Sequence, residues 1–323
     1  MIRTRLTDTF GLDYPIVSAP MAKVAGGRLA AAVSRAGGLG LIGGGYCEAE
    51  WIETEFANAG NTAVGCGFIT WRLAEAPQVL DAALDHGSRA VFLSFGDPRP
   101  FAERIHAAGA ALICQVQTLG DAREAVEAGA RVIVAQGGEA GGHGANRATM
   151  TLVPEVADLL RTGSPETLLL AAGGIADGRG LAAALMLGAD GVLVGTRFCL
   201  SDEALIPPQF QQAGIAASGD QTVATKVVDI VRGYDWPERF RIRVLDNAFT
   251  ARWQDDLDGL RADPAQHAAW GAALAAGDPS VANPVLGEGI GLVKGSAPAA
   301  EIMKQMAHEA EALLAGGWDR RKS

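Results

Sequence analysis

The segment Arg131–Gly144, RVIVAQGGEAGGHG, holds the residues of this chain that are best suited to chemistry. It begins with β-branched residues, which predict a buried strand. Five glycines then fall within eight positions around a single histidine, His143. Glycine packs nothing and costs chain entropy, so this density indicates a backbone that approaches a ligand closely. An imidazole there can move a proton near neutral pH. We expect His143 to be catalytic; the alternative is a glycine-rich surface turn with an incidental histidine.

Two later segments, AAGGIADG and VGTR, end predicted strands and carry residues suited to a phosphate. Barrel enzymes often bind phosphate at the ends of their last two strands, with backbone N–H groups and a helix N-terminus. Gly173 and Gly174 lack side chains that would block a phosphate, whereas Gly195 and Thr196 offer amides and a hydroxyl. We therefore predict phosphate binding by this pair of loops. Two ordinary helix-entry turns are the alternative.

Small residues close the first predicted strand, where Ala19, Pro20 and Met21 follow Ser18. Such a sequence suits a flat ring lying against the backbone, and the methionine sulfur makes a soft contact with it. A plain turn at the strand end explains the pattern equally well.

Three glutamines, Gln115, Gln117 and Gln136, interrupt otherwise apolar strands. A buried amide without partners costs about 1–3 kcal/mol, so each one needs a partner. For Gln136 we favour a heteroaromatic ligand. For Gln115 and Gln117 a ligand and ordered water are equal alternatives.

Eight short apolar runs predict the strands that position these groups. Amphipathic, alanine-rich segments that close on glycine lie between them, as helices do. The runs begin at Pro15, Leu39, Ala63, Ala90, Ala111, Arg131, Thr167 and Asp190. Apolar strands alternating with helices indicate a parallel sheet, and eight units close a (β/α)8 TIM barrel. A doubly wound open sheet is the alternative.

The longest interval between runs, from Arg131 to Thr167, contains the glycine-rich segment. Barrels enlarge the loop after a strand where they build a site, which favours an active site here. A second glycine pattern, Gly38–Gly43, matches the dinucleotide fingerprint G-x-G-x-x-G. That fingerprint needs a strand before it and a helix after it, and here the order is reversed, so we reject it.

No further apolar run of this kind follows Leu200. We interpret residues 1–202 with about 291–323 as the barrel, to which a last helix near Ala299–Ala315 returns. Residues of about 203–290, with helix-like pieces QTVATKVVDIVRG and AQHAAWGAALAAG, are expected to form a smaller, mostly helical domain over the barrel mouth.

The bulk composition narrows the class of protein. The 323 residues carry a net charge of −10 without a basic cluster, which argues against nucleic acid. No long apolar run predicts a membrane span, and the N-terminus lacks the apolar core of a signal peptide. The four cysteines are scattered, and no Cys/His cluster predicts a metal site. We expect a cytoplasmic enzyme with buried free thiols; the sequence leaves a homodimer open.

Taken together, AQGGEAGGHG, the opening FGLDYPIVSAPMA, the segment AAGGIADGRGLAAALMLGADGV and VGTRF resemble the nitronate monooxygenase family, formerly called 2-nitropropane dioxygenases. The resemblance runs from about Phe10 to Phe198. It implies an FMN-dependent (β/α)8 barrel that oxidises alkyl nitronates with molecular oxygen.

The resemblance also assigns roles to matching residues. His143 corresponds to the active-site histidine. Together with the residues singled out above, the expected FMN contacts are Ala19, Pro20, Met21, Gly67, Gln115, Gln136, Gly141, Gly173, Gly174, Leu193, Val194, Gly195 and Thr196. The sequence departs from the family pattern at two places. Gly67 stands where many members have an asparagine, and Cys114–Gln117 stands where others have a lysine. The environment of the flavin ring can therefore differ, and with it the substrate.

The same Glu-Ala-Gly-Gly-His signature occurs in FMN-dependent enoyl-ACP reductases, and related barrels reduce quinones with NAD(P)H. The motif supports the cofactor better than the reaction. The leading hypothesis is oxidation of nitronates, or of nitroalkanes, to a carbonyl compound and nitrite. The alternatives are an NAD(P)H-dependent quinone or enoyl-thioester reductase and a non-catalytic FMN or phosphate binder.

Overall fold

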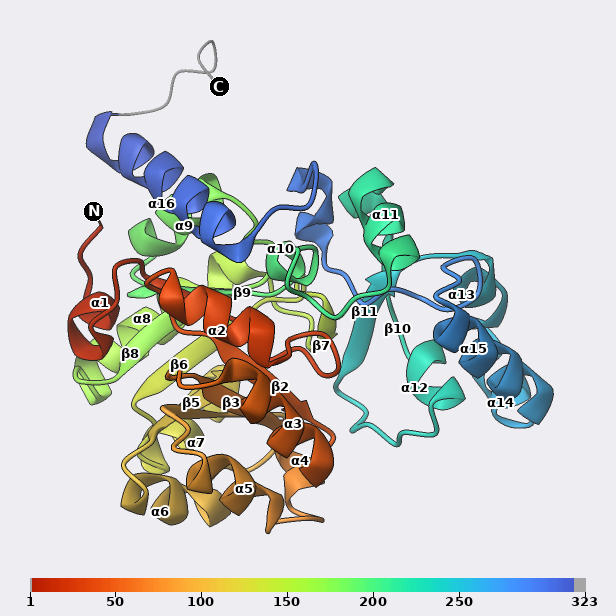
Figure 1. Cartoon of the computed structure of the whole chain (residues 1–323), viewed down its shortest axis with the longest axis horizontal. Helices are drawn as coiled ribbons and strands as arrows, with labels where there is room; N and C mark the ends of the chain where they lie inside the picture. The colour runs from red at the N-terminus through yellow and green to blue at the C-terminus, as the bar shows by residue number, and fades with distance from the viewer. Residues whose placement is uncertain (1, 317–323) are drawn as a thin grey trace.

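A closed ring of parallel strands forms the centre of the computed structural model, which describes residues 2–316 (Figure 1). The strands pair in the order β1-β9-β8-β6-β5-β4-β3-β2. They are β1 (Ile16–Ser18), β2 (Leu41–Gly45), β3 (Gly65–Ile69), β4 (Ala90–Ser94), β5 (Ala111–Val116), β6 (Val132–Gln136), β8 (Leu168–Ala172) and β9 (Gly191–Val194). The ring closes where Val17 bridges Leu39 and the Ser18 N–H donates to the Leu39 carbonyl at 3.0 Å.

Each predicted apolar run contains one of these strands, and the closure decides for the (β/α)8 barrel over the open sheet. The helices packed outside it are α2 (Gly27–Arg35), α3 (Ala49–Ala59), α4 (Thr70–Leu73), α5 (Val79–Asp85), α6 (Arg99–Ala107), α7 (Leu119–Glu127), α8 (Thr149–Gly163), α9 (Gly178–Met186), α10 (Thr196–Cys199) and α16 (Ala299–Gly316). The final helix, α16, lies along α9 and α2 as expected (Figure 1). The rejected fingerprint at Gly38–Gly43 runs into β2, which confirms that a strand follows it.

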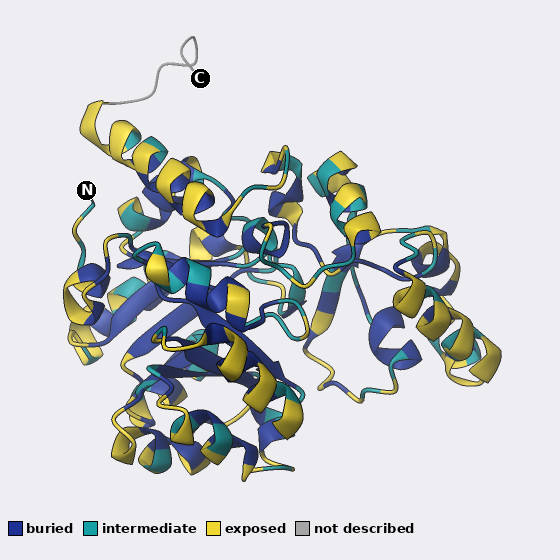
Figure 2. Ribbon diagram, viewed as in Figure 1, coloured by how far each residue is buried: buried dark blue, intermediate teal, exposed yellow. Residues whose placement is uncertain are grey.

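Alternate residues of each strand face opposite sides, which gives the barrel two apolar layers. One layer fills the inside with side chains such as Val17, Leu41, Phe92 and Leu170. The other packs the outer face of the strands against the helices. Figure 2 shows the strands buried along their length and the exposed residues on the outer faces of the helices. The barrel is therefore a packed core, and a site can form only at one end.

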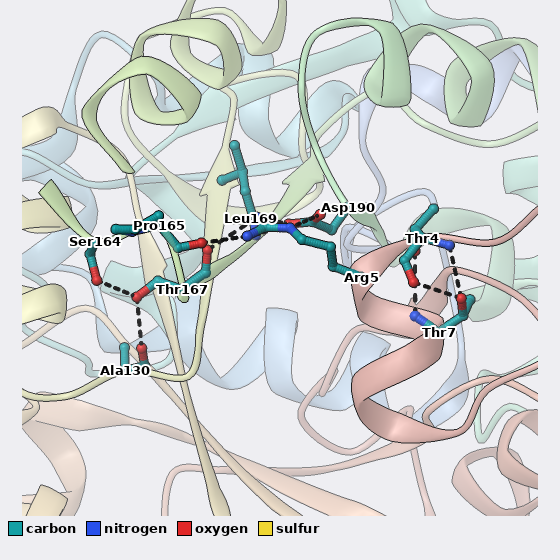
Figure 3. Close-up of polar contacts among 9 residues, drawn as sticks. All are labelled: Thr4, Arg5, Thr7, Ala130, Ser164, Pro165, Thr167, Leu169 and Asp190. Atoms are coloured by element: carbon teal, nitrogen blue, oxygen red, sulfur yellow. Dashed lines mark hydrogen bonds and ion pairs between the residues drawn. The ribbon is translucent and has the colours of Figure 1, made fainter. Parts of the chain in front are cut away.

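Helix α1 (Arg5–Phe10) covers the amino ends of the strands, with Leu6 and Phe10 in the inner apolar layer. Arg5 on this helix donates two hydrogen bonds to Asp190, at 2.8 and 2.7 Å, and reaches the carbonyls of Pro165 and Thr167 (Figure 3). These partners precede β8 and β9. The amino end of the barrel is thus closed, which leaves the carboxyl end for chemistry.

Residues between Leu200 and the start of α16 form a lobe beside the barrel, seen in Figure 1 around α11 to α15. Its elements are α11 (Pro208–Ala216), η1 (Gly219–Gln221), β10 (Thr222–Thr225), α12 (Val227–Val231), β11 (Arg241–Leu245), α13 (Ala248–Trp253), α14 (Leu257–Arg261), α15 (Pro264–Ala276) and η2 (Glu288–Leu292). The predicted helix in AQHAAWGAALAAG is α15. Within residues 2–316, no helix combines the length and apolar character needed to cross a membrane.

Two local expectations were wrong. QTVATKVVDIVRG is not one helix, because its β-branched start forms β10 and only its second half turns into α12. The glycine-rich segment is not only a loop, because β7 (Gly142–Gly144) pairs antiparallel with β11 in a sheet of order β10-β11-β7. In both cases a partner strand distant in sequence decides the conformation. Residues 43–45 belong to β2 and carry its register shift.

Candidate active site

A cavity of about 240 Å³ opens at the carboxyl ends of the barrel strands. All but one of the predicted site residues line it: Ala19, Pro20, Met21, Gly67, Gln115, Gln136, Gly141, His143, Gly173, Gly174, Leu193, Gly195 and Thr196. Val194 is the exception, because its side chain packs in the layer between strands and helices. The barrel therefore brings together residues that are far apart in the sequence.

The histidine His143 is fixed by the sheet that joins the barrel to the lobe. In β7 it lies opposite Ile242 of β11, and its carbonyl accepts a hydrogen bond from the Gln136 side chain at 3.1 Å. Its imidazole stacks on the indole of Trp236, with ring centroids 3.4 Å apart and an interplanar angle of 9°. The ring of Phe95 meets it edge-on. Backbone and ring are therefore both held in place.

A buried carboxylate, Asp229 of α12, completes the surroundings of His143. Its Oδ1 lies 2.8 Å from His143 Nε2, and the two side chains are only 4% and 7% exposed. Burial lowers the pKa of His143 because it disfavours the charged ring; Asp229 opposes this effect and the positive charge of Arg232 adds to it. Burial therefore favours the neutral form of the ring, which can accept a proton.

The cation Arg232 lines the same cavity and makes no ion pair with any residue between 2 and 316. Its guanidinium lies over the rings of Tyr46 and Tyr234, 5.1 and 4.8 Å from their centroids. Tyr46 and Tyr234 stack on each other at 4.0 Å. Aromatic faces hold a cation without neutralising it. The cavity thus presents positive charge to whatever enters it.

Sequence reasoning missed Asp229, Arg232 and Trp236, all from one segment of the lobe. One signal was available: Asp229 interrupts the apolar run VVDIV. The same reasoning that singled out the glutamines applies to a carboxylate in a buried run.

The three glutamines satisfy one another, contrary to the expectation that a ligand satisfies Gln136. Gln136 Oε1 accepts hydrogen bonds from Gln115 Nε2 at 3.1 Å and Gln117 Nε2 at 2.8 Å. Its own amide donates to the His143 carbonyl. Their burial therefore needs no ligand, although Gln115 and Gln136 still line the cavity.

The two loops after β8 and β9 present free amides to the cavity. The backbone N–H groups of Gly174, Gly195 and Thr196 donate to no acceptor in the described part of the chain. The N-terminus of α9 is taken, because the first N–H groups of that helix bind the carboxylates of Asp177 and Glu309. An anion that binds at this rim can therefore accept hydrogen bonds from the loop amides but not from the N-terminus of α9.

The glycine Gly67 in β3 is required by packing. A Cβ added there would lie 2.4 Å from Cγ of Pro20, so any side chain would displace the segment Ala19–Met21. This close contact explains why the asparagine typical of the family has no room here. The contact also brings Pro20 to the cavity wall.

The sequence matches the family described as nitronate monooxygenase over residues 3–64 and 57–309. A nitronate monooxygenase from Neurospora crassa is 34% identical over 340 residues, covering 92% of this chain and 89% of the relative. Among solved structures, FabK from Thermotoga maritima superposes with a TM-score of 0.84 at 29% identity, covering 97% of this chain and 98% of the other. Nitroalkane oxidase from Streptomyces ansochromogenes superposes with a TM-score of 0.79 at 26% identity, covering 95% and 98%. The chain belongs to the nitronate monooxygenase family and is an oxidoreductase.

Proposed function

We propose that this enzyme uses FMN to oxidise alkyl nitronates, or nitroalkanes, with molecular oxygen to a carbonyl compound and nitrite. The observation that carries the proposal is a single cavity that holds the imidazole of His143, a cation without an ion pair and three backbone amides without an acceptor among residues 2–316. The positive charge of Arg232 can bind a reactive anionic substrate, and the backbone amides can bind the phosphate of a cofactor. The family supports the reaction class.

The residues at the rim fit FMN. A Cβ added at Gly195 would meet nothing closer than 3.6 Å, so the loop has room for a bound group beside its α-carbon. We assign the phosphate to the N–H groups of Gly174, Gly195 and Thr196. The flat segment Ala19–Met21 would hold the ring system. When bound, FMN supplies the acceptor for the substrate's electrons and the site of reaction with oxygen.

The residues of the chain itself bind and orient the substrate. A nitronate is a stabilised carbanion, and its nitro oxygens carry the negative charge that Arg232 can bind. His143 can donate or accept a hydrogen bond there, or remove the α-proton of a neutral nitroalkane. Trp236 and Phe95, packed around the imidazole, exclude water from one side of it.

We assign residues of about 203–290 to a second domain that covers the barrel mouth. In support, this lobe has an apolar core of its own, which includes Val228, Trp253 and Trp270. It also supplies Arg232 and Trp236 to the cavity wall, and Asp229 to the buried side of His143. In this assignment the lobe is part of the active site and not an accessory.

The decisive experiment mixes the flavin-loaded enzyme anaerobically with ethyl nitronate or with NADH and follows the flavin absorbance. Rapid bleaching by the nitronate, together with slow or no bleaching by NADH, is the expected result. Bleaching by NADH alone would establish the reductase alternative. A flavin that neither donor reduces would leave a non-catalytic binder.

A further inference from the structure

The carboxylate of Asp229 is buried with a single partner. Oδ1 lies against His143 Nε2, while Oδ2 is enclosed and has no hydrogen-bond partner. Arg232, three residues further along the chain, makes no ion pair with it. Burying a carboxylate with so few partners is costly, because the unpaired oxygen has lost its hydration without a replacement. Such a costly arrangement indicates that the contact between Asp229 and His143 has a functional role.

A carboxylate can only accept hydrogen bonds, so the proton of this contact belongs to His143 Nε2. In a neutral imidazole the other nitrogen, Nδ1, then carries the lone pair. Nδ1 has no hydrogen-bond partner among residues 2–316 and is not sealed from the cavity. The stack on Trp236 and the edge of Phe95 hinder a flip of the ring. One nitrogen is thus held by Asp229 and the other is left for the substrate.

We propose that Asp229 is a positioning residue that holds His143 in the Nε2–H tautomer, so that Nδ1 removes the α-proton of a neutral nitroalkane. The inference rests on the proposed function and deepens it, because it names the residue that fixes the proton of His143 and the ring nitrogen that acts on a nitroalkane. In this step the C–H bond breaks and its electron pair stays on the substrate, which becomes the nitronate. An Nδ1–H bond forms, and Asp229 stabilises the resulting imidazolium.

Few charged or titratable groups surround His143. The lobe contributes Asp229 and Arg232, and Tyr46 after β2 lies beside Arg232. The groups packed directly on the ring, Trp236 and Phe95, do not titrate in the accessible range. Of these groups, only Asp229 raises the pKa of His143. Its loss should therefore move the pKa of His143 further down.

The test compares Asp229→Asn with Asp235→Asn, which removes the same charge from an exposed position in the same segment. Both variants are assayed with nitroethane and with preformed ethyl nitronate. For Asp229→Asn we expect kcat/KM on nitroethane to fall by roughly 10²–10⁴-fold, the range for loss of general base catalysis. Its acid limb should move to lower pH. Activity on the nitronate should change far less, and Asp235→Asn should resemble wild type.

A second measurement does not depend on turnover. Nitrogen-15 NMR of the imidazole rings in the flavin-loaded protein distinguishes protonated from unprotonated nitrogens, and a His143→Asn sample identifies the signals. We expect protonated Nε2 and unprotonated Nδ1 in wild type. The reverse tautomer in wild type, or equal losses on both substrates in Asp229→Asn, would overturn the inference.

The two measurements separate the possible failures. If wild type oxidises neither substrate while NMR shows the Nε2–H tautomer, the proposed reaction is wrong and the positioning of His143 stands. If wild type oxidises nitronates but not nitroethane, the proposed function stands and the proton-abstraction role is refuted. If Asp229→Asn does not fold, the NMR spectrum and the two-substrate comparison of wild type still decide.

Discussion

The substitution Gly195→Ala tests whether the rim amides hold a phosphate. The added Cβ would lie 3.6 Å from Cβ of Ala19 and 3.9 Å from Sδ of Met21, which are ordinary van der Waals distances. The fold should therefore accept the methyl group, with a change in the free energy of unfolding of about 1 kcal/mol or less. If a phosphate binds at this amide, we expect the methyl group on the adjacent α-carbon to restrict its approach.

The magnitude follows from the hydrogen bond that is lost. A hydrogen bond to a charged group is worth about 1.5–3 kcal/mol. Since 1.4 kcal/mol is a factor of ten, losing one such contact should raise the Kd for FMN by roughly 10–100-fold. Riboflavin lacks the phosphate, so its Kd should rise much less. The gap between the two Kd values isolates the phosphate contact.

The assay is fluorescence titration of the flavin-free protein with FMN and with riboflavin. The matched control is Gly271→Ala in α15, where an added Cβ meets nothing within 4 Å and should leave both Kd values unchanged. An equal rise for FMN and riboflavin would place the effect at the ring. An unchanged Kd for FMN would refute the phosphate assignment altogether.

Three further substitutions test other parts of the molecule. His143→Ala should retain FMN and lose activity on neutral nitroalkanes far more than on preformed nitronates; equal losses in steady-state assays would remove the base role. Arg232→Met keeps the apolar stem of the side chain and removes its charge. The lost charged hydrogen bond is worth about 1.5 kcal/mol or more, so KM for nitronates should rise by roughly tenfold. An unchanged KM would exclude anion binding by Arg232. Arg5→Met leaves the buried Asp190 carboxylate without its guanidinium partner. Because the Arg5 side chain is 52% exposed and solvent screens the pair, the free energy of unfolding measured in urea should fall by only about 1–2 kcal/mol. An unaltered free energy of unfolding would show that α1 is held by its apolar contacts alone.

Local sequence pattern was sufficient for the barrel. Apolar runs of β-branched residues predict buried parallel strands wherever both faces of a sheet are covered, and helix ends are marked by caps such as Gly37 and Thr118. The glycines at the strand ends were also readable, because a backbone that must stay open to a ligand excludes side chains. Almost every predicted site residue therefore lines the observed cavity.

Reasoning about hydrogen-bond satisfaction from sequence was less successful. Gln115, Gln117 and Gln136 do need partners, but the sequence favoured a ligand for Gln136 and left a ligand and ordered water as equal alternatives for the other two. The partners are the other glutamines and the His143 carbonyl. Which amide meets which depends on strand register, and register is set by the pairing of β5 with β6.

The amino-acid sequence by itself determined the eight-strand barrel, the glycine-lined rim and the position of the histidine beside it, because periodicity, capping and glycine preference act over a few residues. Only the tertiary structure decided what surrounds His143. Asp229 lies 86 residues further along the chain, and no local rule relates the two. They meet because β11 pairs with β7 and β10, which brings α12 and Trp236 to the barrel mouth. Such antiparallel pairing is fixed by the packing of the whole lobe, a free energy shared among many distant residues.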